Sequence, residues 1–378
     1  MGEREHELLA MLRLTLCKGL GQCSINRLVA CLGSAAAVLN APGAALAAEL
    51  ELPPNALSAI ERVPGEETAI REWERAESAG VRLLMHSDPE YPRPLRYLDE
   101  AAPPLLWMRG RWERSDALSV AVVGSRSCSP YGRTHARRLA AALASMGFTI
   151  VSGLARGIDS EAHRAALQAG GRSVAVVASG LDAVGKSDSA ELAAAVAESG
   201  AILSELPMDV PPRAGNFPPR NRLISGLAPG VLVVEAAARS GSLITARLAA
   251  EQGKSVMALP GPVDSLTSRG AHELIRDGAI LVQDAQDVVE ALGPLPMPVE
   301  LPAAEGADAG ACLVDDPRVM ALNPREREIH GLLSSRPVQI DEIITQTGLA
   351  ASIVSSILLT LEIRGLARQL PGQCYTRP

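Results

Sequence analysis

The chain contains the stretches LSVAVVGSRS at residues 118–127 and TIVSGLARGID at residues 149–159. Each is a short apolar run that ends in a turn containing glycine and serine, and a segment of helical pattern follows each turn. Short apolar runs of this kind are typical of strands buried on both faces of a parallel sheet. The two stretches therefore predict a repeating unit of strand, turn and helix.

The same alternation continues through the middle of the chain. It predicts an α/β fold, a Rossmann-like, doubly wound and mostly parallel sheet with helices on both faces. Ligands of such sheets bind outside the carboxyl ends of the strands. We expect strands at 118–123, 149–152, 173–178, 201–204, 230–235 and 255–258, and helices at 130–146, from 159, and at 189–199, 221–226 and 244–252.

Shifts in composition divide the chain into four parts. Residues 1–80 are predicted to form a small helical domain, and residues 81–292 the Rossmann-like domain. Residues 293–322 are rich in proline, glycine and alanine, which is typical of a flexible linker. Residues 323–378 are predicted to form a separate terminal domain.

The 378 residues carry a formal net charge of −7, from 36 lysines and arginines against 43 aspartates and glutamates. This balance excludes a generally basic, histone-like nucleic-acid binder. The excess acid lies outside the central domain, because residues 120–292 hold 16 cationic and 16 anionic side chains. A local basic site is therefore compatible with the composition. Aromatic residues are scarce, and the two phenylalanines are Phe148 and Phe217.

The sequence offers no signal for a membrane, a metal or a cofactor. It has no run of about 20 uncharged apolar residues, and its acidic N-terminus does not resemble a secretory signal. The six cysteines form no C-x-x-C pair, which argues against zinc and against a disulfide framework. A Walker A loop and a G-x-G-x-x-G fingerprint are both missing, so NAD and FAD are not expected. We expect a cytoplasmic protein with reduced cysteines.

Turns of glycine and serine follow several expected strands. The turn at 124–126 offers N–H groups and an arginine that could hold a phosphate, although a plain strand-to-helix turn would look the same. For Asp159 and His163 we favour structural roles, Asp159 as the cap of the following helix and His163 packed beneath the turn. Further turns lie at 240–242 and 259–261. In a parallel sheet all of them would lie along one rim.

Residues 213–222 (RAGNFPPRNR) combine three arginines with one of the two phenylalanines, and we expect them to form a loop before a helix. Such a loop suits single-stranded nucleic acid, because arginines bind phosphates while a base stacks on the ring, worth about 1–3 kcal/mol per base. Two alternatives stay open. Phe217 could instead anchor the loop in a hydrophobic niche, and Arg222 could pair with Glu205 or Glu235.

Signals for catalysis are weak. The sequence has no G-x-S-x-G elbow and no H-E-x-x-H motif. Glu205 and Glu235 end two expected strands and could act as a carboxylate pair. We favour a structural role for both, in which they orient Arg222 or hold turns.

Taken together, these segments resemble the DNA-processing protein A family (DprA, also called Smf), densely over residues 88–292. One departure is AVGKSD at 183–188, where family members usually carry Tyr-Pro and an asparagine. The matching motifs are DPEYP at 88–92, PLLW at 104–107, VGSR at 123–126, YG at 131–132, SGLARGID at 152–159, AH at 162–163, GLD at 180–182, LSE at 203–205, FP at 217–218, RNR at 220–222, SGSLIT at 240–245 and PG at 260–261.

The resemblance implies a non-catalytic protein that binds single-stranded DNA, protects incoming strands and loads the RecA recombinase during natural transformation. It also implies a homodimer. Duplex DNA, bound through the flanking domains, is a further partner that the sequence leaves open. The DNA contacts that the resemblance implies are Ser125, Arg126, Lys186, Arg213, Phe217, Arg220, Asn221, Arg222, Ser240, Gly241 and Ser242.

The flanking domains also resemble parts of this family. Lys18-Gly19-Leu20-Gly21 and the helix expected at 24–31 look like half of a helix-hairpin-helix in a sterile-alpha-motif-like domain, for which we favour packing over DNA contact. The tail resembles a winged helix, with helices at 325–333, 340–347 and 351–365 and a hairpin from 366–370 and 373–376. Its third helix has a single arginine, Arg364, so a protein contact or a weak backbone contact is expected rather than base reading.

Two rival functions come from other classes. Nucleoside-monophosphate phosphoribohydrolases use similar sheets, and Glu205 or Glu235 would then be catalytic. Those enzymes carry a Pro-Gly-Gly-x-Gly-Thr motif, of which this sequence has only Pro260-Gly261. The other rival is a protein-interaction adaptor that binds through the tail.

Overall fold

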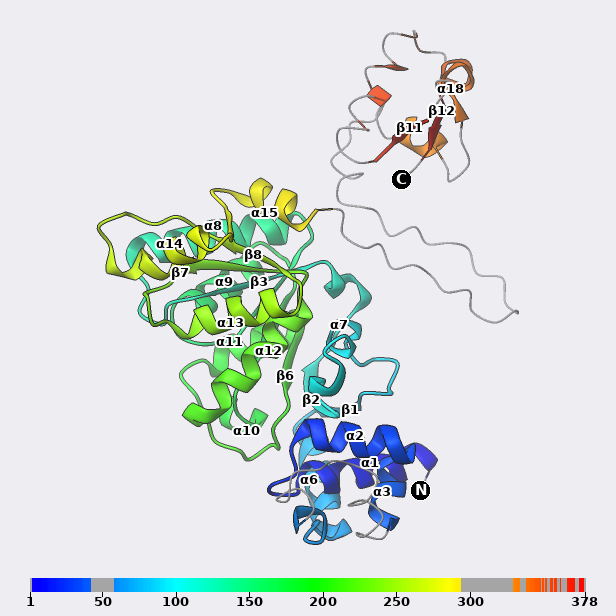
Figure 1. Ribbon diagram of the computed structural model, residues 1–378, viewed down its shortest axis with the longest axis vertical. Coiled ribbons are helices and arrows are strands. Elements are labelled where there is room, and N and C mark those ends of the chain that lie inside the picture. Colours follow the sequence, from blue (N-terminus) through cyan, green and yellow to red (C-terminus); the bar gives the residue numbers. More distant parts are fainter. Residues whose placement is uncertain are drawn as a thin grey trace. The chain divides into compact units, whose positions relative to one another are not determined.

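The chain forms two compact units, Met1–Gly293 and Pro294–Pro378. The computed structural model describes residues 2–41 and 58–293 of the first unit (Figure 1). In the second unit it describes 329–333, 338–347, 349, 351, 354–355, 357–358, 361, 366–370 and 374–376. The linker predicted at 293–322 lies outside the described residues except for Gly293.

A nine-stranded sheet forms the centre of the first unit, in the order β1-β2-β6-β5-β4-β3-β7-β8-β9. The six strands expected from the sequence are present, and the one expected at 173–178 ends at Val176. Strands β1, β2 and β9 were not predicted individually. The strands are β1 Val81–Met85, β2 Leu105–Gly110, β3 Ser119–Gly124, β4 Thr149–Ser152, β5 Ser173–Val176, β6 Ala201–Ser204, β7 Gly230–Glu235, β8 Ser255–Ala258 and β9 Ile280–Leu281.

The pairing of the strands confirms the Rossmann-like prediction. From β6 through β3 to β9 every pair is parallel, whereas β2 pairs antiparallel with both β1 and β6. Every residue of β4, β5, β6 and β7 is buried. Burial on both faces explains why these strands appear in the sequence as continuous apolar runs.

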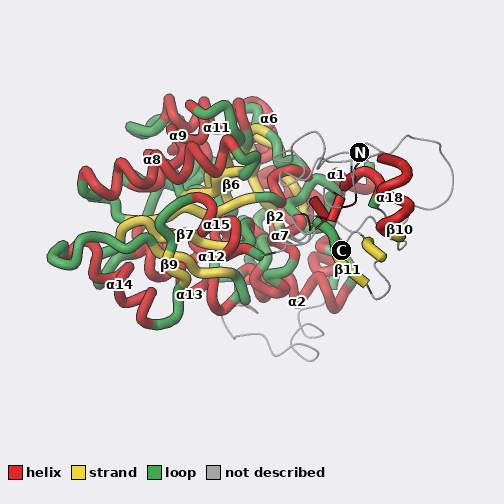
Figure 2. The backbone as a smooth tube through the Cα atoms, turned by 90° about the horizontal axis from the view of Figure 1, so that it is seen from above, coloured by secondary structure: helices red, strands yellow, loops and turns green. Residues whose placement is uncertain are grey.

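Helices cover both faces of the sheet, and Figure 2 shows the two layers on either side of the strands. No helix among the residues that the structure describes is long and apolar enough to cross a membrane. One layer contains α8 Pro130–Ser145, α9 Ile158–Gln168 and α11 Ala190–Ser199, and the other contains α12 Phe217–Leu227, α13 Gly241–Glu251 and α14 Arg269–Arg276. The other helices of this region are α7 Arg93–Arg96, α10 Leu181–Val184 and α15 Ala285–Leu292.

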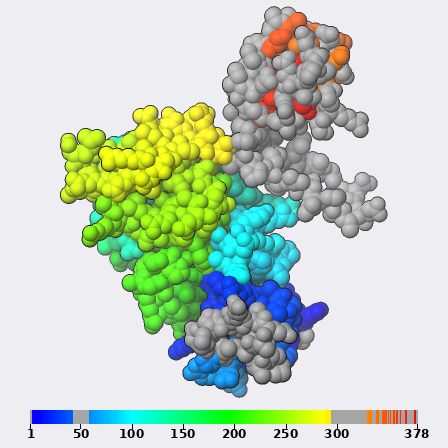
Figure 3. Space-filling view, viewed as in Figure 1, coloured from blue at the N-terminus to red at the C-terminus, as the bar shows by residue number. Residues whose placement is uncertain are grey.

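The N-terminal helices share a hydrophobic core with the sheet. They are α1 Glu3–Thr15, α2 Gln22–Leu32, α3 Ala35–Asn40 and α6 Glu66–Ser78. Their buried apolar side chains belong to the same cluster as Trp107 of β2. The Trp107 indole donates a hydrogen bond to the Glu72 carboxylate of α6 at 3.0 Å, and burial raises the pKa of that carboxyl. Figure 3 shows these helices, in blue, directly against the sheet region. The domain boundary expected at residue 80 falls between α6 and β1 and stays a prediction.

The described part of the tail contains α18 Ile340–Thr347 and a three-stranded sheet in the order β10-β12-β11. Strands β11 Arg368–Leu370 and β12 Cys374–Thr376 pair antiparallel, as expected of the hairpin, and β10 is Val338–Gln339. The described residues within 351–365 are helical, but Arg364 lies outside them. Ile343, Val354 and Leu358 are buried in a core belonging to this unit.

His163 of α9 is fully buried, in line with the structural role favoured for it. Its Nδ1 is 2.7 Å from the Ser173 hydroxyl, and its Nε2 is buried without a hydrogen-bond partner. Burial lowers the pKa of His163 to about 3, and the nearby charges of Arg220 and Arg164 act in the same direction. The imidazole is therefore neutral in the folded protein at neutral pH.

The folded protein should lose stability when acid protonates this histidine in the unfolded chain only. The pKa of His163 is lower in the folded state than its ordinary value of 6.5. The unfolded chain therefore binds a proton as the pH falls through 6.5, and the folded chain binds one only near pH 3. The resulting loss is about 1.4 kcal/mol per pH unit in this window.

Urea unfolding at pH 7 and pH 5 measures this loss. The free energy of unfolding should fall about 2 kcal/mol further in the wild type than in His163→Gln. An equal fall in the two proteins would contradict the proposed titration of His163.

Candidate nucleic-acid interface

The carboxyl ends of β3, β4, β5, β7 and β8 lie along one rim of the sheet, because these strands are parallel. The strand order reverses between β3 and β7. On one side of β3 the chain adds β4, β5 and β6, and on the other side it adds β7 and β8. Such a switch point opens a crevice that is the usual ligand site of this fold. The glycine and serine turns that the sequence singled out follow these strand ends.

The loop after β3 is held by Glu235 at the end of β7. The backbone N–H of Ser125 donates to the Glu235 carbonyl at 2.8 Å, and that of Ser129 donates to the Glu235 carboxylate at 3.0 Å. Ser129 also caps α8, accepting from the N–H of Gly132, where a larger side chain would collide with Glu235. The carboxylate is buried at the positive end of the α8 helix dipole, where it holds this turn.

Arg126 and Phe217 stack at the switch point. The guanidinium carbon of Arg126 lies 4.4 Å from the centre of the Phe217 ring, and Arg126 itself is exposed. Phe217 is half-buried, and the guanidinium carbon of Arg220 lies 5.9 Å from its ring centre. The alternative that the ring anchors this segment stays a prediction. The stack is a cation–π pair, which brings a phosphate-binding fork and a flat ring together.

The sequence placed the start of the helix after this segment too late. Helix α12 begins at Phe217 rather than at Asn221, so Pro218, Pro219 and Arg220 lie in its first turn. Proline is tolerated there because the first N–H groups of a helix have no partner within the helix. The prolines that suggested a loop are therefore compatible with the first turn of a helix.

Two of the predicted contacts, Arg220 and Asn221, point into the protein. Arg220 is 4% exposed and donates hydrogen bonds to the carbonyls of Gly153 and Val176, which ties α12 to the ends of β4 and β5. Burial lowers the pKa of Arg220 to about 10, so it remains charged at neutral pH. Asn221 is also buried. The described structure therefore gives both residues an internal role and no free surface for a phosphate.

Asp159 lies beside Arg220 and holds the same turn. It occupies the second position of α9, whereas Gly157 is the cap, so the prediction that Asp159 caps this helix is wrong. Its carboxylate accepts from the N–H of Gly153 at 3.1 Å. Burial raises the pKa of Asp159, and the positive charge of Arg220 opposes that shift. The structural role favoured for Asp159 is present in a different form.

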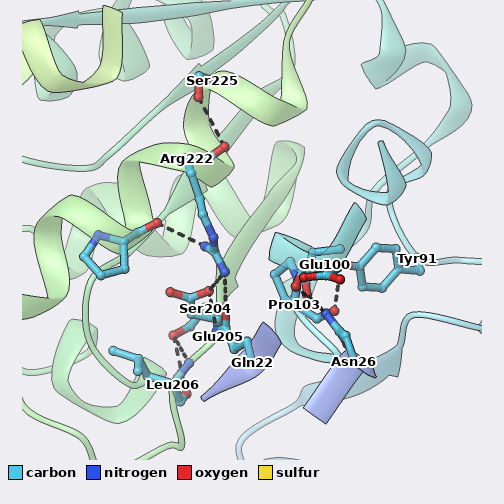
Figure 4. Close-up of polar contacts among 12 residues, drawn as sticks. Gln22, Asn26, Tyr91, Glu100, Pro103, Ser204, Glu205, Leu206, Arg222 and Ser225 are labelled. Atoms are coloured by element: carbon cyan, nitrogen blue, oxygen red, sulfur yellow. Dashed lines mark hydrogen bonds and ion pairs between the residues drawn. The ribbon is translucent and has the colours of Figure 1, made fainter. Parts of the chain in front are cut away.

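Arg222 pairs with Glu205, as one of the two alternatives expected. Its Nη2 lies 2.7 Å from Glu205 Oε2, and Gln22 of α2 donates to the same oxygen at 2.7 Å (Figure 4). Arg222 also contacts Gln22 directly. The side chains of Arg222 and Glu205 are 13% and 6% exposed. Both are therefore used in joining α12, β6 and α2.

The remaining predicted residues differ in exposure. Lys186, just after α10, and Arg213, before the short 3-10 helix Ala214–Asn216, are exposed. Ser240 caps α13, Gly241 is exposed and Ser242 is buried. The sequence did not single out Arg156 and Arg239, which are exposed in the turns after β4 and β7. Both lie inside or beside motifs already quoted, so their place after strand ends was the signal.

Comparisons with known proteins point to one family. A family model described as "DNA recombination-mediator protein A" matches residues 82–293, and one described as "DprA winged helix domain" matches residues 315–373. Protein Smf of Escherichia coli (strain K12) is 42% identical over 290 residues, which are 76% of each chain. DNA processing protein DprA of Streptococcus pneumoniae (strain ATCC BAA-255 / R6) is 44% identical over 188 residues, 50% of this chain and 66% of that protein.

Solved structures agree as well. The X-ray structure of DprA from Streptococcus pneumoniae matches with a TM-score of 0.65 and 32% identity, covering 75% of this chain and 97% of that one. DprA from Helicobacter pylori, described for its single-stranded DNA binding mode, matches with a TM-score of 0.50 and 31% identity, covering 56% of this chain and 95% of that one. The resemblance seen in the motifs is confirmed, and the chain belongs to the DNA-processing protein A (DprA/Smf) family.

Proposed function

We propose that this protein binds single-stranded DNA along the rim of its sheet and acts as a recombination mediator rather than as an enzyme. The stack of Arg126 on Phe217 at the switch point carries the proposal. A nucleic-acid strand needs a cation for its phosphate and a flat surface for its base, and this pair offers both within 4.4 Å. Exposed cations at Arg156, Lys186 and Arg213 extend the positive surface along the same rim.

The positions of the two candidate carboxylates favour binding over catalysis. Glu205 is engaged by Arg222 and Gln22, and Glu235 by the start of α8. A phosphoribohydrolase would need one of them free to face its substrate. The enzymatic alternative predicts release of free base from AMP that is lost in Glu205→Gln or Glu235→Gln. We expect no release from the wild type.

The wider role is proposed from the family. We propose that the protein acts in the cytoplasm as a homodimer, protects incoming single strands and loads RecA onto them during natural transformation. DprA of Helicobacter pylori, described for binding single-stranded DNA, supports the first step. The rate at which RecA assembles on an oligonucleotide, with and without this protein, tests the loading step. An unchanged rate with strand-bound protein would restrict the role to protection.

Removing the ring should weaken binding of single-stranded DNA. We expect Phe217→Ala to reduce the affinity for oligo-dT by about 1–3 kcal/mol, because a stacked base is lost. Fluorescence anisotropy measures the affinity, and unfolding by urea checks that the variant is folded. A folded variant that binds with undiminished affinity would show that no base stacks on Phe217.

Removing a rim cation should change the salt dependence as well as the affinity. Each phosphate neutralised on a single strand contributes about 0.7 to the slope of log affinity against log salt. We expect Arg126→Ala and Lys186→Ala each to lower the slope by about that amount. Arg114→Ala, in the 3-10 helix Arg114–Ala117 before β3 at the opposite edge, is the matched control. Slopes unchanged in both rim variants would rule out this rim as the site.

A further inference from the structure

Three arginines surround one carboxylate on the outer surface of α8 and α9. Glu161 Oε2 lies 2.5 Å from Arg137 Nε, and Glu161 Oε1 lies 3.7 Å from both Arg133 Nε and Arg164 Nη1. The two helices pack side by side on one face of the sheet (Figure 2). We call Arg133, Arg137 and Arg164 the arginine cluster.

The arginine cluster carries more positive charge than its partner can neutralise. Its side chains are 49–56% exposed, whereas that of Glu161 is 11% exposed. Helix α8 contains no acidic residue, and the other acidic residue of α9, Asp159, is buried beside Arg220. One arginine is enough to pair Glu161, so about two positive charges face the solvent. Exposed ion pairs add little stability, which gives the extra arginines no structural reason.

The arginine cluster is continuous with the rim. Helices α8 and α9 both begin at the rim. The N–H of Ile158 at the start of α9 donates to the Ser125 carbonyl at 3.2 Å. The turn between β4 and α9 carries exposed Arg156, and its Gly157 packs against the backbone of Ser125 and Arg126. At 1.5 Å of rise per residue, the arginine cluster lies roughly 5–10 Å along the helices from the rim.

From this arrangement we infer that the arginine cluster is a second phosphate-binding surface, over which a single strand continues after it leaves the rim. This inference rests on the proposed function and extends its site. Guanidinium groups bind phosphate oxygens in a fork, and Arg126 and Arg156 supply cations between the ring of Phe217 and the cluster. Interfaces between proteins have apolar centres. On α8 and α9 the described large apolar side chains are covered, and Met146, 38% exposed, lies just past the far end of α8.

The double variant Arg133→Gln/Arg164→Gln tests the inference while keeping the close Arg137–Glu161 pair. Its matched control is Arg71→Gln/Arg114→Gln, which removes two exposed arginines elsewhere in the full-length chain. Anisotropy is measured on oligo-dT of about six and about thirty nucleotides. Losing two phosphate contacts should lower the salt slope for the long strand by about 1.4, equivalent to roughly 10- to 30-fold weaker binding near 0.1 M salt. Short-strand binding should change less than about threefold.

The outcomes separate this inference from the proposed function. Suppose that the double variant binds the long strand as tightly as the control does, while Arg126→Ala weakens the binding of both strands. The rim is then the site, and the arginine cluster is not part of it. If Arg126→Ala leaves both affinities unchanged, the proposed rim site itself fails. If the double variant keeps its affinity for the long strand but loses binding to poly-glutamate, the arginine cluster serves an acidic protein and the inference is wrong.

Discussion

The hydrogen bonds accepted by Glu235 are the interactions on which the rim depends. Its backbone carbonyl joins the end of β7 to the loop after β3, and its buried carboxylate joins the same end to the first turn of α8. The strand order of the sheet reverses between β3 and β7. The same contacts hold the backbone of Ser125 and leave Arg126 exposed beside Phe217. The buried negative charge of Glu235 thus has a structural role, and it positions the exposed positive charge of Arg126.

The three arginines of residues 213–222 divide into two groups by direction. Arg220 and Arg222 point inward, the first to backbone carbonyls and the second to Glu205, whereas Arg213 lies at the surface. Inward arginines set where α12 lies, and therefore where its first residue, Phe217, presents its ring. The segment is rich in arginine for two different reasons, only one of which concerns a ligand.

The sequence predicted the sheet well because six of its strands appear as apolar runs; β4, β5, β6 and β7 are buried throughout, and β3 is buried in all but its last residue. It did not predict β1, β2 and β9 individually; β9 is only two residues long, and both are exposed. The rim position of the turns followed from parallel pairing. The inward direction of the Arg220 and Asn221 side chains could not be predicted in this way. The start of a helix and its buried partners depend on contacts between residues distant in sequence. Gln22, about 200 residues from Arg222, had no local signal at all.

The contact of α2 with the rim has a consequence for energetic coupling. Gln22 is hydrogen-bonded to both Glu205 and Arg222, so the N-terminal helices and α12 share one polar junction (Figure 4). Thermodynamic linkage is reciprocal. If a molecule bound to α2 and the proposed ligand of α12 both alter this junction, each changes the affinity of the other by the same factor.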